Sequence, residues 1–355
     1  MNSLLAFVVV LGVLIFFHEL GHFLIARAFG VGVETFSLGF GPRILGKKIG
    51  ITDYRISAFP LGGFVKMVGE EPDSEIEPHE VSLSFSHKHV LKKILIVAAG
   101  PVANFLLAIV IFFGLFYIYG VMVLKPVVGN IDENGAAYDA GLKKNDQIQS
   151  INGISITSWD EMAKLIASSD GKPLDISLMR DEAVMSVQVI PALKITKNLF
   201  GEDTKRYMIG IASAGDIFFE KLNIYQAVIE SSSQVYKISK LTLISLVKMI
   251  EGTISAKDNL GGPIQIAQMA GKFYKEGIAN FISFIAFLSV TLAIVNFFPI
   301  PVLDGGHILF FTIELITGRP VNIKAREVAQ RAGVFLLVLL MVFVFYNDIM
   351  RLLGH

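Results

Sequence analysis

The sequence predicts a polytopic α-helical membrane protein with about four transmembrane helices and an inserted soluble α+β domain. The 355-residue chain is 53% hydrophobic and has a mean hydropathy of +0.61, which is more apolar than soluble globular proteins usually are. Its apolar residues are concentrated in four segments that are candidates for crossing a bilayer, which takes about 20 residues. Between the second and third segments, turn signals and short strand-like runs replace the long apolar runs.

The four predicted transmembrane helices occupy residues 1–30, 94–120, 280–299 and 333–351. The first lacks the basic n-region and the small-residue cleavage site of a secretory signal, and its apolar run is longer than a signal h-region. We therefore expect it to be retained as a membrane helix. The fourth has the shortest apolar core, which Arg331 and Asp348 bracket.

The charges of the connecting segments predict the orientation. Segments 31–93 and 300–332 are rich in lysine and arginine, which places both in the cytoplasm by the positive-inside rule. Both termini and the long segment 121–279 then lie on the extracytoplasmic side. That segment also carries many lysines, but long domains are exempt from the charge rule.

Residues 121–213 are predicted to form the soluble α+β domain. Short β-branched runs at residues 148–151, 174–178 and 184–189 predict strands, and Asn-Gly and Asp-Gly pairs predict turns. Trp159 to Ala167 is predicted to be a helix, with Ser158 as its N-cap and Glu161 three residues later. Residues 214–279 then change to a helical period, which predicts amphipathic helices at the membrane surface.

The first predicted span contains His18-Glu19-Leu20-Gly21-His22. His18 and His22 are four residues apart and share one helix face, so their imidazoles can hold two corners of a zinc tetrahedron. Glu19 can then act as a base toward water. Charged groups cost about 2.5–3.5 kcal/mol each inside a span, and a metal satisfies all three residues together. The alternatives are a polar face packed against another helix and a proton-relay pair in a transporter.

A third metal ligand is predicted at Asp304. The chain has no cysteine, so the ligands must be His, Asp or Glu. Asp304 follows the third span in a segment with two prolines and two glycines, which should present backbone and side chains to a cavity. Two alternatives stay open at this point: Asp304 as the N-cap of a helix, and His307 as the ligand.

Several motifs, in this order, resemble those of the site-2 proteases, and within them the bacterial regulator-of-sigma-E protease group. The matching stretches are His18 to His22, Phe36-Ser37-Leu38-Gly39-Phe40-Gly41-Pro42, Phe59-Pro60-Leu61-Gly62-Gly63-Phe64-Val65-Lys66-Met67, Gly100-Pro101-Val102-Ala103-Asn104, Leu260-Gly261-Gly262-Pro263-Ile264 and Asn296 to Gly305. The resemblance covers nearly the whole chain. It implies an intramembrane zinc metalloprotease.

The resemblance also assigns roles. His18, His22 and Asp304 would ligate Zn²⁺, and Glu19 would be the catalytic base. The residues that would bind the substrate or the tetrahedral intermediate are Asn296, Pro299, Pro301, Gly62, Gly63 and Phe64. The last three belong to a membrane-associated β-hairpin, residues 55–67, that would pair with an unfolded substrate segment. The strand-like runs of residues 49–67 agree with a hairpin that turns at Pro60-Leu61-Gly62-Gly63, although an ordinary cytoplasmic hairpin would look the same.

The soluble domain resembles a single PDZ domain. Its clearest stretches are Ala140-Gly141-Leu142-Lys143-Lys144-Asn145-Asp146-Gln147-Ile148 and Ile151-Asn152-Gly153. Ile209 and Gly210 would belong to the strand and loop that receive peptide ends. Some relatives carry two such domains in tandem.

The resemblance implies regulated intramembrane proteolysis in the bacterial cytoplasmic (inner) membrane, with the active site toward the cytoplasmic side and the PDZ domain in the periplasm. Expected substrates are single-span membrane proteins, namely anti-sigma factors and remnant signal peptides, already cut by an upstream site-1 protease. The expected partners are these substrates and the lipid bilayer, and the chain is expected to be a monomer. The formal net charge of zero gives no support for a nucleic-acid partner.

Two other functions compete with the protease. A catalytically inactive PDZ scaffold or quality-control receptor would keep the fold and lose the chemistry, and the intact His18, Glu19, His22 and Asp304 argue against it. An ion or metal transporter would need further acidic or histidine residues in the other spans, and the second and third spans offer almost none.

Overall fold

The computed structural model describes residues 2–70, 77–78 and 80–353. Residues 71–76 and 79, inside the predicted cytoplasmic segment 31–93, lie outside the described residues. The chain divides into two compact units, one formed by residues 1–115 and 228–355 and the other by residues 116–227. Each is described here by itself.

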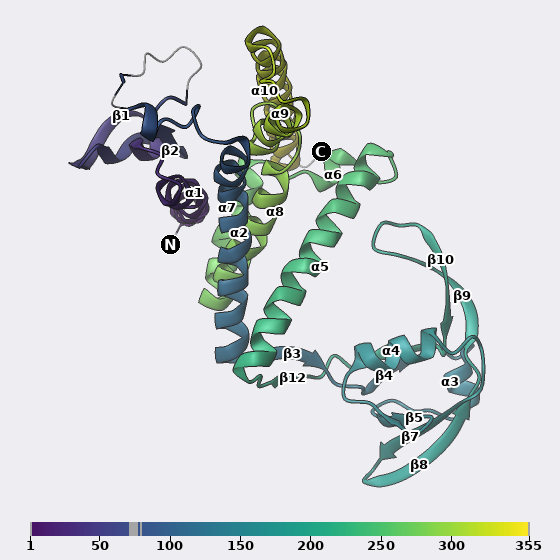
Figure 1. Cartoon of the computed structure of the whole chain (residues 1–355). Helices are drawn as coiled ribbons and strands as arrows, with labels where there is room; N and C mark the ends of the chain where they lie inside the picture. The colour runs from purple at the N-terminus through teal and green to yellow at the C-terminus, as the bar shows by residue number, and fades with distance from the viewer. Residues whose placement is uncertain (1, 71–76, 79, 354–355) are drawn as a thin grey trace. The chain divides into compact units, whose positions relative to one another are not determined.

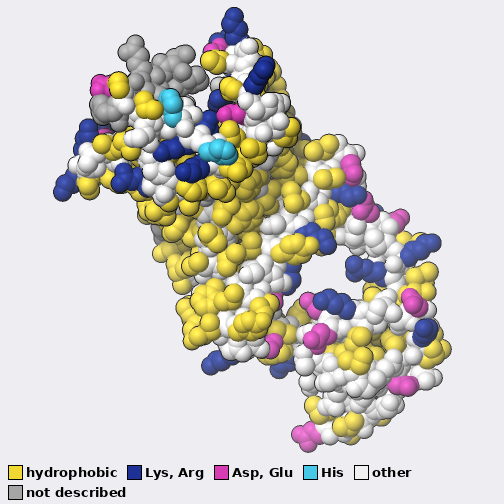
Figure 2. All heavy atoms as spheres, in the orientation of Figure 1, with side chains coloured by type: hydrophobic (Ala, Val, Ile, Leu, Met, Phe, Trp, Pro, Cys, Tyr) yellow, Lys and Arg dark blue, Asp and Glu magenta, His cyan; other side chains and the backbone are white. Residues whose placement is uncertain are grey.

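Four helices of the described chain are long and apolar enough to cross a membrane: α1 (Ser3–Ala28), α2 (Val90–Tyr119), α8 (Ile278–Asn296) and α10 (Ile323–Leu352) (Figure 1). They confirm the four predicted helices. Helix α10 begins ten residues before the predicted span, where the Asn322 side chain accepts a hydrogen bond from the Lys324 amide. In Figure 2, hydrophobic side chains cover much of the visible face of this unit, and lysines and arginines gather at the end that carries β1, β2 and the start of α2.

Helices α1 and α2 approach each other closely because small residues line their crossing. A Cβ on Gly21 would overlap the Ala99 carbonyl oxygen and lie 2.7 Å from Ala103 Cβ. Small residues allow such approach between membrane helices, where packing and hydrogen bonds drive association. Pro101 lies inside α2. This crossing sets α2 against the part of α1 that carries the histidines.

The predicted hairpin is longer than expected and turns elsewhere. Strands β1 (Val33–Ile49) and β2 (Thr52–Met67) meet at the turn formed by Gly50 and Ile51, where Gly50 has φ +61°. The Pro-Leu-Gly-Gly segment that the sequence predicted to be the turn lies within β2. The register explains the length, because Phe36 pairs with both Tyr54 and Val65. The first half of β1 is therefore bordered by two segments of β2.

The remaining elements of this unit connect the spanning helices. They are η1 (Val81–Leu83), α5 (Ile224–Ile250), α6 (Ala256–Asn259), α7 (Pro263–Glu276) and α9 (Asp304–Thr317). Helix α7 packs against α1 and α8. Its first turn is held by the Asp348 carboxylate of α10, which accepts hydrogen bonds from the Gly262, Ile264 and Gln265 amides. The predicted amphipathic region 214–279 contains α5 to α7, but its start is a strand (Ile217–Glu220).

The second unit is an α+β domain, as the sequence predicted. Its elements are β3 (Val121–Leu124), β4 (Val128–Ile131), α3 (Ala136–Asp139), β5 (Gln147–Ile151), β6 (Ile154–Ser155), α4 (Trp159–Ala167), β7 (Leu174–Arg180), β8 (Ala183–Val189), β9 (Ala192–Lys197), β10 (Asp203–Met208), β11 (Ile211–Ser213) and β12 (Ile217–Glu220). One sheet has the order β6-β5-β7-β8, and β4 pairs with β11, β9 with β10 and β3 with β12. Helix α4 begins with the predicted capping box of Ser158 and Glu161.

One apolar core holds this domain together. Alternate residues of β7 point into it, Ile148 and Ile151 of β5 join them on either side of a register shift, and Met162 and Ile166 of α4 cover it. Ile176 and Leu178 are completely buried. The period-two pattern of the strands and the helical period of α4 therefore bury their apolar faces in the same core.

Candidate metal centre

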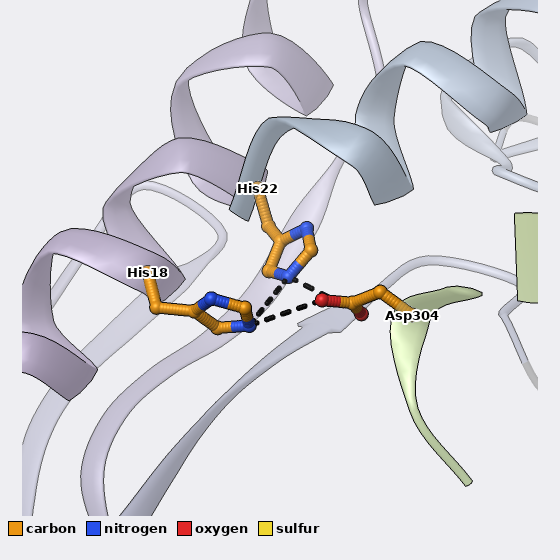
Figure 3. A group of neighbouring side chains, drawn as sticks. All are labelled: His18, His22 and Asp304. Carbon is orange, nitrogen blue, oxygen red and sulfur yellow. Dashed lines mark hydrogen bonds and ion pairs between the residues drawn. The ribbon is translucent and has the colours of Figure 1, made fainter. Parts of the chain in front are cut away.

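His18, His22 and Asp304 converge, although Asp304 is far from the two histidines in the sequence (Figure 3). The histidines occupy successive turns of α1, and Asp304 is the first residue of α9. His18 Nε2 lies 3.2 Å from Asp304 Oδ2, and His22 Nε2 lies 3.6 Å from Asp304 Oδ1. The two Nε2 atoms are 3.3 Å apart. The three potential ligand atoms lie within 4.8 Å of one another.

The segment between α8 and α9 brings Asp304 to the histidines. Helix α8 ends at Asn296, and the chain turns tightly before α9 begins. A Cβ on Gly305 would overlap the Phe297 and Phe298 carbonyl oxygens, and one on Gly306 would overlap the Ile300 carbonyl oxygen. Only glycine allows backbone to approach backbone this closely. The N-cap position belongs to Leu303, so the alternative of Asp304 as the N-cap is wrong.

Helix α2 forms another wall of the site. His22 Nδ1 lies 2.9 Å from the Ile96 carbonyl oxygen, which can only accept, so His22 donates from Nδ1 and leaves Nε2 free toward Asp304. A Cβ on Gly100 would overlap the His22 ring and lie 2.9 Å from His18 Cε1. Glycine at position 100 therefore makes room for both imidazoles.

These residues fit a metal ion. Asp304 Oδ2 is buried and has no hydrogen-bond partner among the residues that the structure describes, and a buried carboxylate oxygen without one is costly. Two imidazoles and one carboxylate are a donor set of catalytic zinc sites, which keep a fourth position open for water or substrate. His307, the rival ligand, lines the same cavity, but the cluster found among the described residues does not include it.

The cluster opens into a cavity of 570 Å³. Of the residues predicted from the sequence, His18, Glu19, His22, Gly63, Phe64 and Asp304 line it. Gly63 is required there, because a Cβ would lie 2.6 Å from Ile15 Cγ2 and 3.0 Å from Glu19 Cγ. Strand β2 thus passes directly beside Glu19.

The other predicted site residues lie elsewhere. Gly62, Asn296, Pro299 and Pro301 are not among the described lining residues of this cavity. Gly62 lies against the Phe40 ring, where a Cβ would overlap it. Asn296 is the last residue of α8. Substrate contacts of these four residues remain predictions.

Ile209 and Gly210 belong to the second unit. The Ile209 side chain is buried in the core with 2% exposure, and its carbonyl accepts a hydrogen bond from the Ala137 amide. The Gly210 carbonyl accepts one from the Asp132 amide, and φ at Gly210 is +83°. The Ile209 side chain is thus part of the fold, and peptide binding by this loop remains a prediction.

Sequence reasoning missed one wall of the cavity. Arg326, Glu327 and Gln330 from the first turns of α10 line it. The sequence placed them in a cytoplasmic loop. Arg326 also lies over the Phe310 and Phe311 rings of α9, at 5.7 and 5.9 Å from their centroids. The available local signal was Asn322, a residue type favoured at helix N-caps, which could have placed the start of α10 there.

Known proteins are similar to this chain over most of its length. The model of the family described as "Peptidase family M50" matches residues 6–340. A protein of Agrobacterium fabrum whose name assigns it to the zinc metalloproteases is 36% identical, over 98% of this chain and 96% of its own length. The regulator of sigma-W protease of Bacillus subtilis is 32% identical, over 99% of each chain. A PDZ domain from Listeria monocytogenes matches 26% of this chain and 86% of that domain with 21% identity, but its TM-score of 0.19 carries no argument.

Proposed function

Since the chain belongs to peptidase family M50 and is a zinc metalloprotease with membrane-spanning helices, we propose that it cleaves peptide bonds within the transmembrane segments of single-span membrane proteins. One observation supports this most strongly: two of the three candidate metal ligands, His18 and His22, lie with Glu19 inside a helix that is itself long and apolar enough to span a bilayer. His18 is 15 residues from the start of α1, or about 22 Å along it. This depth along the helix favours peptide bonds within or beside the membrane as the ones that reach the cavity.

The residues of the cavity divide the chemistry among them. His18, His22 and Asp304 would hold the zinc ion, which would supply Lewis acidity at the scissile carbonyl. Glu19 lies beside the ligands on α1 and would take the proton from the attacking water and return it to the leaving amine. The sequence spacing that places two imidazoles on one helix face also keeps Glu19 at the same cavity.

The edge of β2 offers a way to hold the substrate. Residues 63–67 pair with β1 on one side and line the cavity at Gly63, Phe64 and Val65. An extended peptide can add to such an edge through main-chain hydrogen bonds. A transmembrane helix would have to unwind first, because its backbone is already hydrogen-bonded internally. Substrates with helix-breaking residues near the cleavage site are therefore expected to be cut faster.

The substrate class and the location extend this proposal. The Bacillus relative is named a regulator of sigma-W protease, which favours anti-sigma factors as substrates, with remnant signal peptides as a second group. The basic segments 31–93 and 300–332 favour a bacterial inner membrane with the cavity toward the cytoplasm and residues 121–213 outside. An upstream site-1 protease would make the first cut, and the enzyme would act as a monomer.

The test uses the full-length chain in proteoliposomes with a single-span substrate. Glu19→Gln keeps the size of the side chain and removes the base, so cleavage should fall by about 10²–10⁴-fold. Glu230→Gln, the same change on the surface of α5, should cleave as fast as the wild type. Equal cleavage by wild type and Glu19→Gln would overturn the proposed function.

A further inference from the structure

Asn104 of α2 is a buried polar residue that the proposed chemistry does not use. It is completely buried, and its side-chain Nδ2 lies 3.4 Å from His18 Nδ1. Its Oδ1 is buried and finds no hydrogen-bond partner in the part of the chain that the structure describes. A polar residue inside a spanning helix is costly and is usually kept for a function.

The side chain of Asn104 is not needed to join the helices. Asn104 does contact α8, but through its backbone carbonyl, which accepts a hydrogen bond from Ser289 Oγ at 2.8 Å. Any residue at position 104 keeps that carbonyl. The amide group is therefore available for His18.

The tautomer of His18 determines whether Asn104 must donate or accept a hydrogen bond. Nε2 of His18 faces Asp304 and His22. A neutral imidazole that binds a metal through Nε2 carries its proton on Nδ1. The partner of Nδ1 must therefore accept a hydrogen bond, as the Ile96 carbonyl oxygen does for His22.

The two ends of an asparagine amide have the same shape, and the surrounding hydrogen bonds decide which end faces a partner. With Oδ1 toward His18, the amide oxygen accepts a hydrogen bond from His18 Nδ1. The buried oxygen then has the partner that it lacks in the opposite orientation. One rotation of the amide thus pairs His18 Nδ1 with Asn104 Oδ1, and it moves Nδ2 to the position that Oδ1 occupied.

We propose that Asn104 is a positioning residue of the metal centre: its Oδ1 accepts a hydrogen bond from His18 Nδ1 and so keeps Nε2 unprotonated and aimed at the metal. This inference rests on the proposed metal site. Both histidines then donate a hydrogen bond from Nδ1 to α2, His22 to a backbone carbonyl and His18 to a side chain. Of these two bonds, the one to Asn104 can be removed by substitution.

The test is the zinc affinity of the full-length protein in detergent, measured by competition with a chelator. Asn104→Leu has a similar size but no acceptor, and loss of such outer-shell partners typically weakens metal binding about 10–100-fold. Asn104→Asp can accept but cannot donate, so it should bind zinc at least as tightly as the wild type. Ser289→Ala removes the other hydrogen bond at Asn104 and should leave the zinc affinity within about threefold of the wild type.

The outcomes separate the possibilities. Wild-type affinity in Asn104→Leu, or equal weakening in Asn104→Leu and Asn104→Asp, would overturn the inference. Equal weakening in Ser289→Ala and Asn104→Leu would assign Asn104 to helix packing instead. If Asn104→Asp does not fold, Asn104→Thr replaces it, because the threonine hydroxyl can accept the same hydrogen bond from His18 Nδ1. Asn104→Thr must then bind zinc more tightly than Asn104→Leu. Absence of zinc binding in the wild type would instead refute the metal site itself.

Discussion

Asp146 of the second unit and Asp304 of the helical unit have opposite surroundings. In the second unit, Asp146 is completely buried and accepts hydrogen bonds at 2.7 Å from the Lys143 amide and from Arg180 Nε and Nη2. In the helical unit, the Asp304 side chain is 18% exposed and lies beside two imidazoles, and its Oδ2 has no hydrogen-bond partner among the described residues.

The difference separates a structural carboxylate from one that is kept for a ligand. A buried charge is tolerated when other groups of the chain satisfy it, as the guanidinium and an amide do for Asp146. The hydrogen bonds that Arg180 donates to Asp146 also raise the pKa of the Arg180 guanidinium. Asp304 lacks such partners among the described residues, so a bound cation would be the partner of its carboxylate. The first carboxylate stabilises a fold, and the second prepares a site.

Replacing Asp304 or Asp146 by alanine should have opposite effects on zinc affinity and on thermal stability. These are the largest effects that we expect. Asp304→Ala should weaken zinc binding by more than the roughly 100-fold that outer-shell changes reach, and it should leave the unfolding temperature of the metal-free protein unchanged. Asp146→Ala should leave zinc affinity unchanged and unfold the second unit at a lower temperature. Zinc affinity by chelator competition and thermal unfolding in detergent measure both. An equal loss of zinc affinity in Asp304→Ala and Asp146→Ala would contradict the distinction between a metal ligand and a structural carboxylate.

A smaller effect is expected when only the partner of Asp146 is removed. Arg180→Met leaves the carboxylate buried without its cation, which costs about 3–5 kcal/mol for a fully buried pair, and Arg180 is 19% exposed, so we expect about 2–4 kcal/mol. Hydrogen exchange of the Ile148 and Ile176 amides in the full chain reports this loss. Unchanged protection would show that the ion pair is not structural.

The capping box of α4 is exposed, and its contribution should be smaller still. Ser158 Oγ accepts a hydrogen bond from the Glu161 amide. Replacement of such an N-cap residue by alanine lowers the stability by about 1 kcal/mol. Ser158→Ala should therefore lower the protection of the α4 amides by about fivefold, with no effect on zinc affinity. Ser168→Ala, at the other end of the helix, serves as the control. A loss of zinc affinity in Ser158→Ala would contradict the independence of the two sites.

The same capping box predicts the smallest effect, which is a pH dependence of the stability of α4. Hydrogen bonds from the Thr157 backbone and hydroxyl lower the pKa of Glu161 below its usual value of 4.5. The folded pKa is depressed, so the stabilisation is present above the unfolded pKa and is lost as the pH falls through the folded value. Protection of the α4 amides should accordingly fall below about pH 4.5 in the wild type and not in Glu161→Gln. The same pH dependence in both would assign it to another group.

Periodic patterns predicted most of the fold. The four spans follow from the concentration of apolar residues, and Trp159–Ala167 from its cap and its period. The hairpin turn was predicted at Pro60-Leu61-Gly62-Gly63, because local turn signals are stronger there than at Gly50 and Ile51. The glycines of that segment serve another purpose, which only the packed structure reveals: Gly62 and Gly63 let β2 pass against Phe40 and α1.

The site was predictable in part for the same reason. His18 and His22 are neighbours on a helix, so their spacing alone places them together. Asp304 could be proposed because cysteine is absent and its segment breaks a span. Asn104 carried a signal that was left without a role, namely a polar residue in an apolar span. Arg326, Glu327 and Gln330 carried none, because their place at the cavity depends on how α10 packs.

X-ray absorption at the zinc edge of the purified Glu19→Gln protein tests the central claim most directly, since this variant keeps the proposed ligands and does not cleave. The account predicts one zinc per chain, with a shell of nitrogen and oxygen donors at about 2.0–2.2 Å that contains two imidazoles. It also predicts that Asp304→Ala loses the metal while His307→Ala keeps it. A shell with three imidazoles, or zinc retained by Asp304→Ala and lost by His307→Ala, would contradict it.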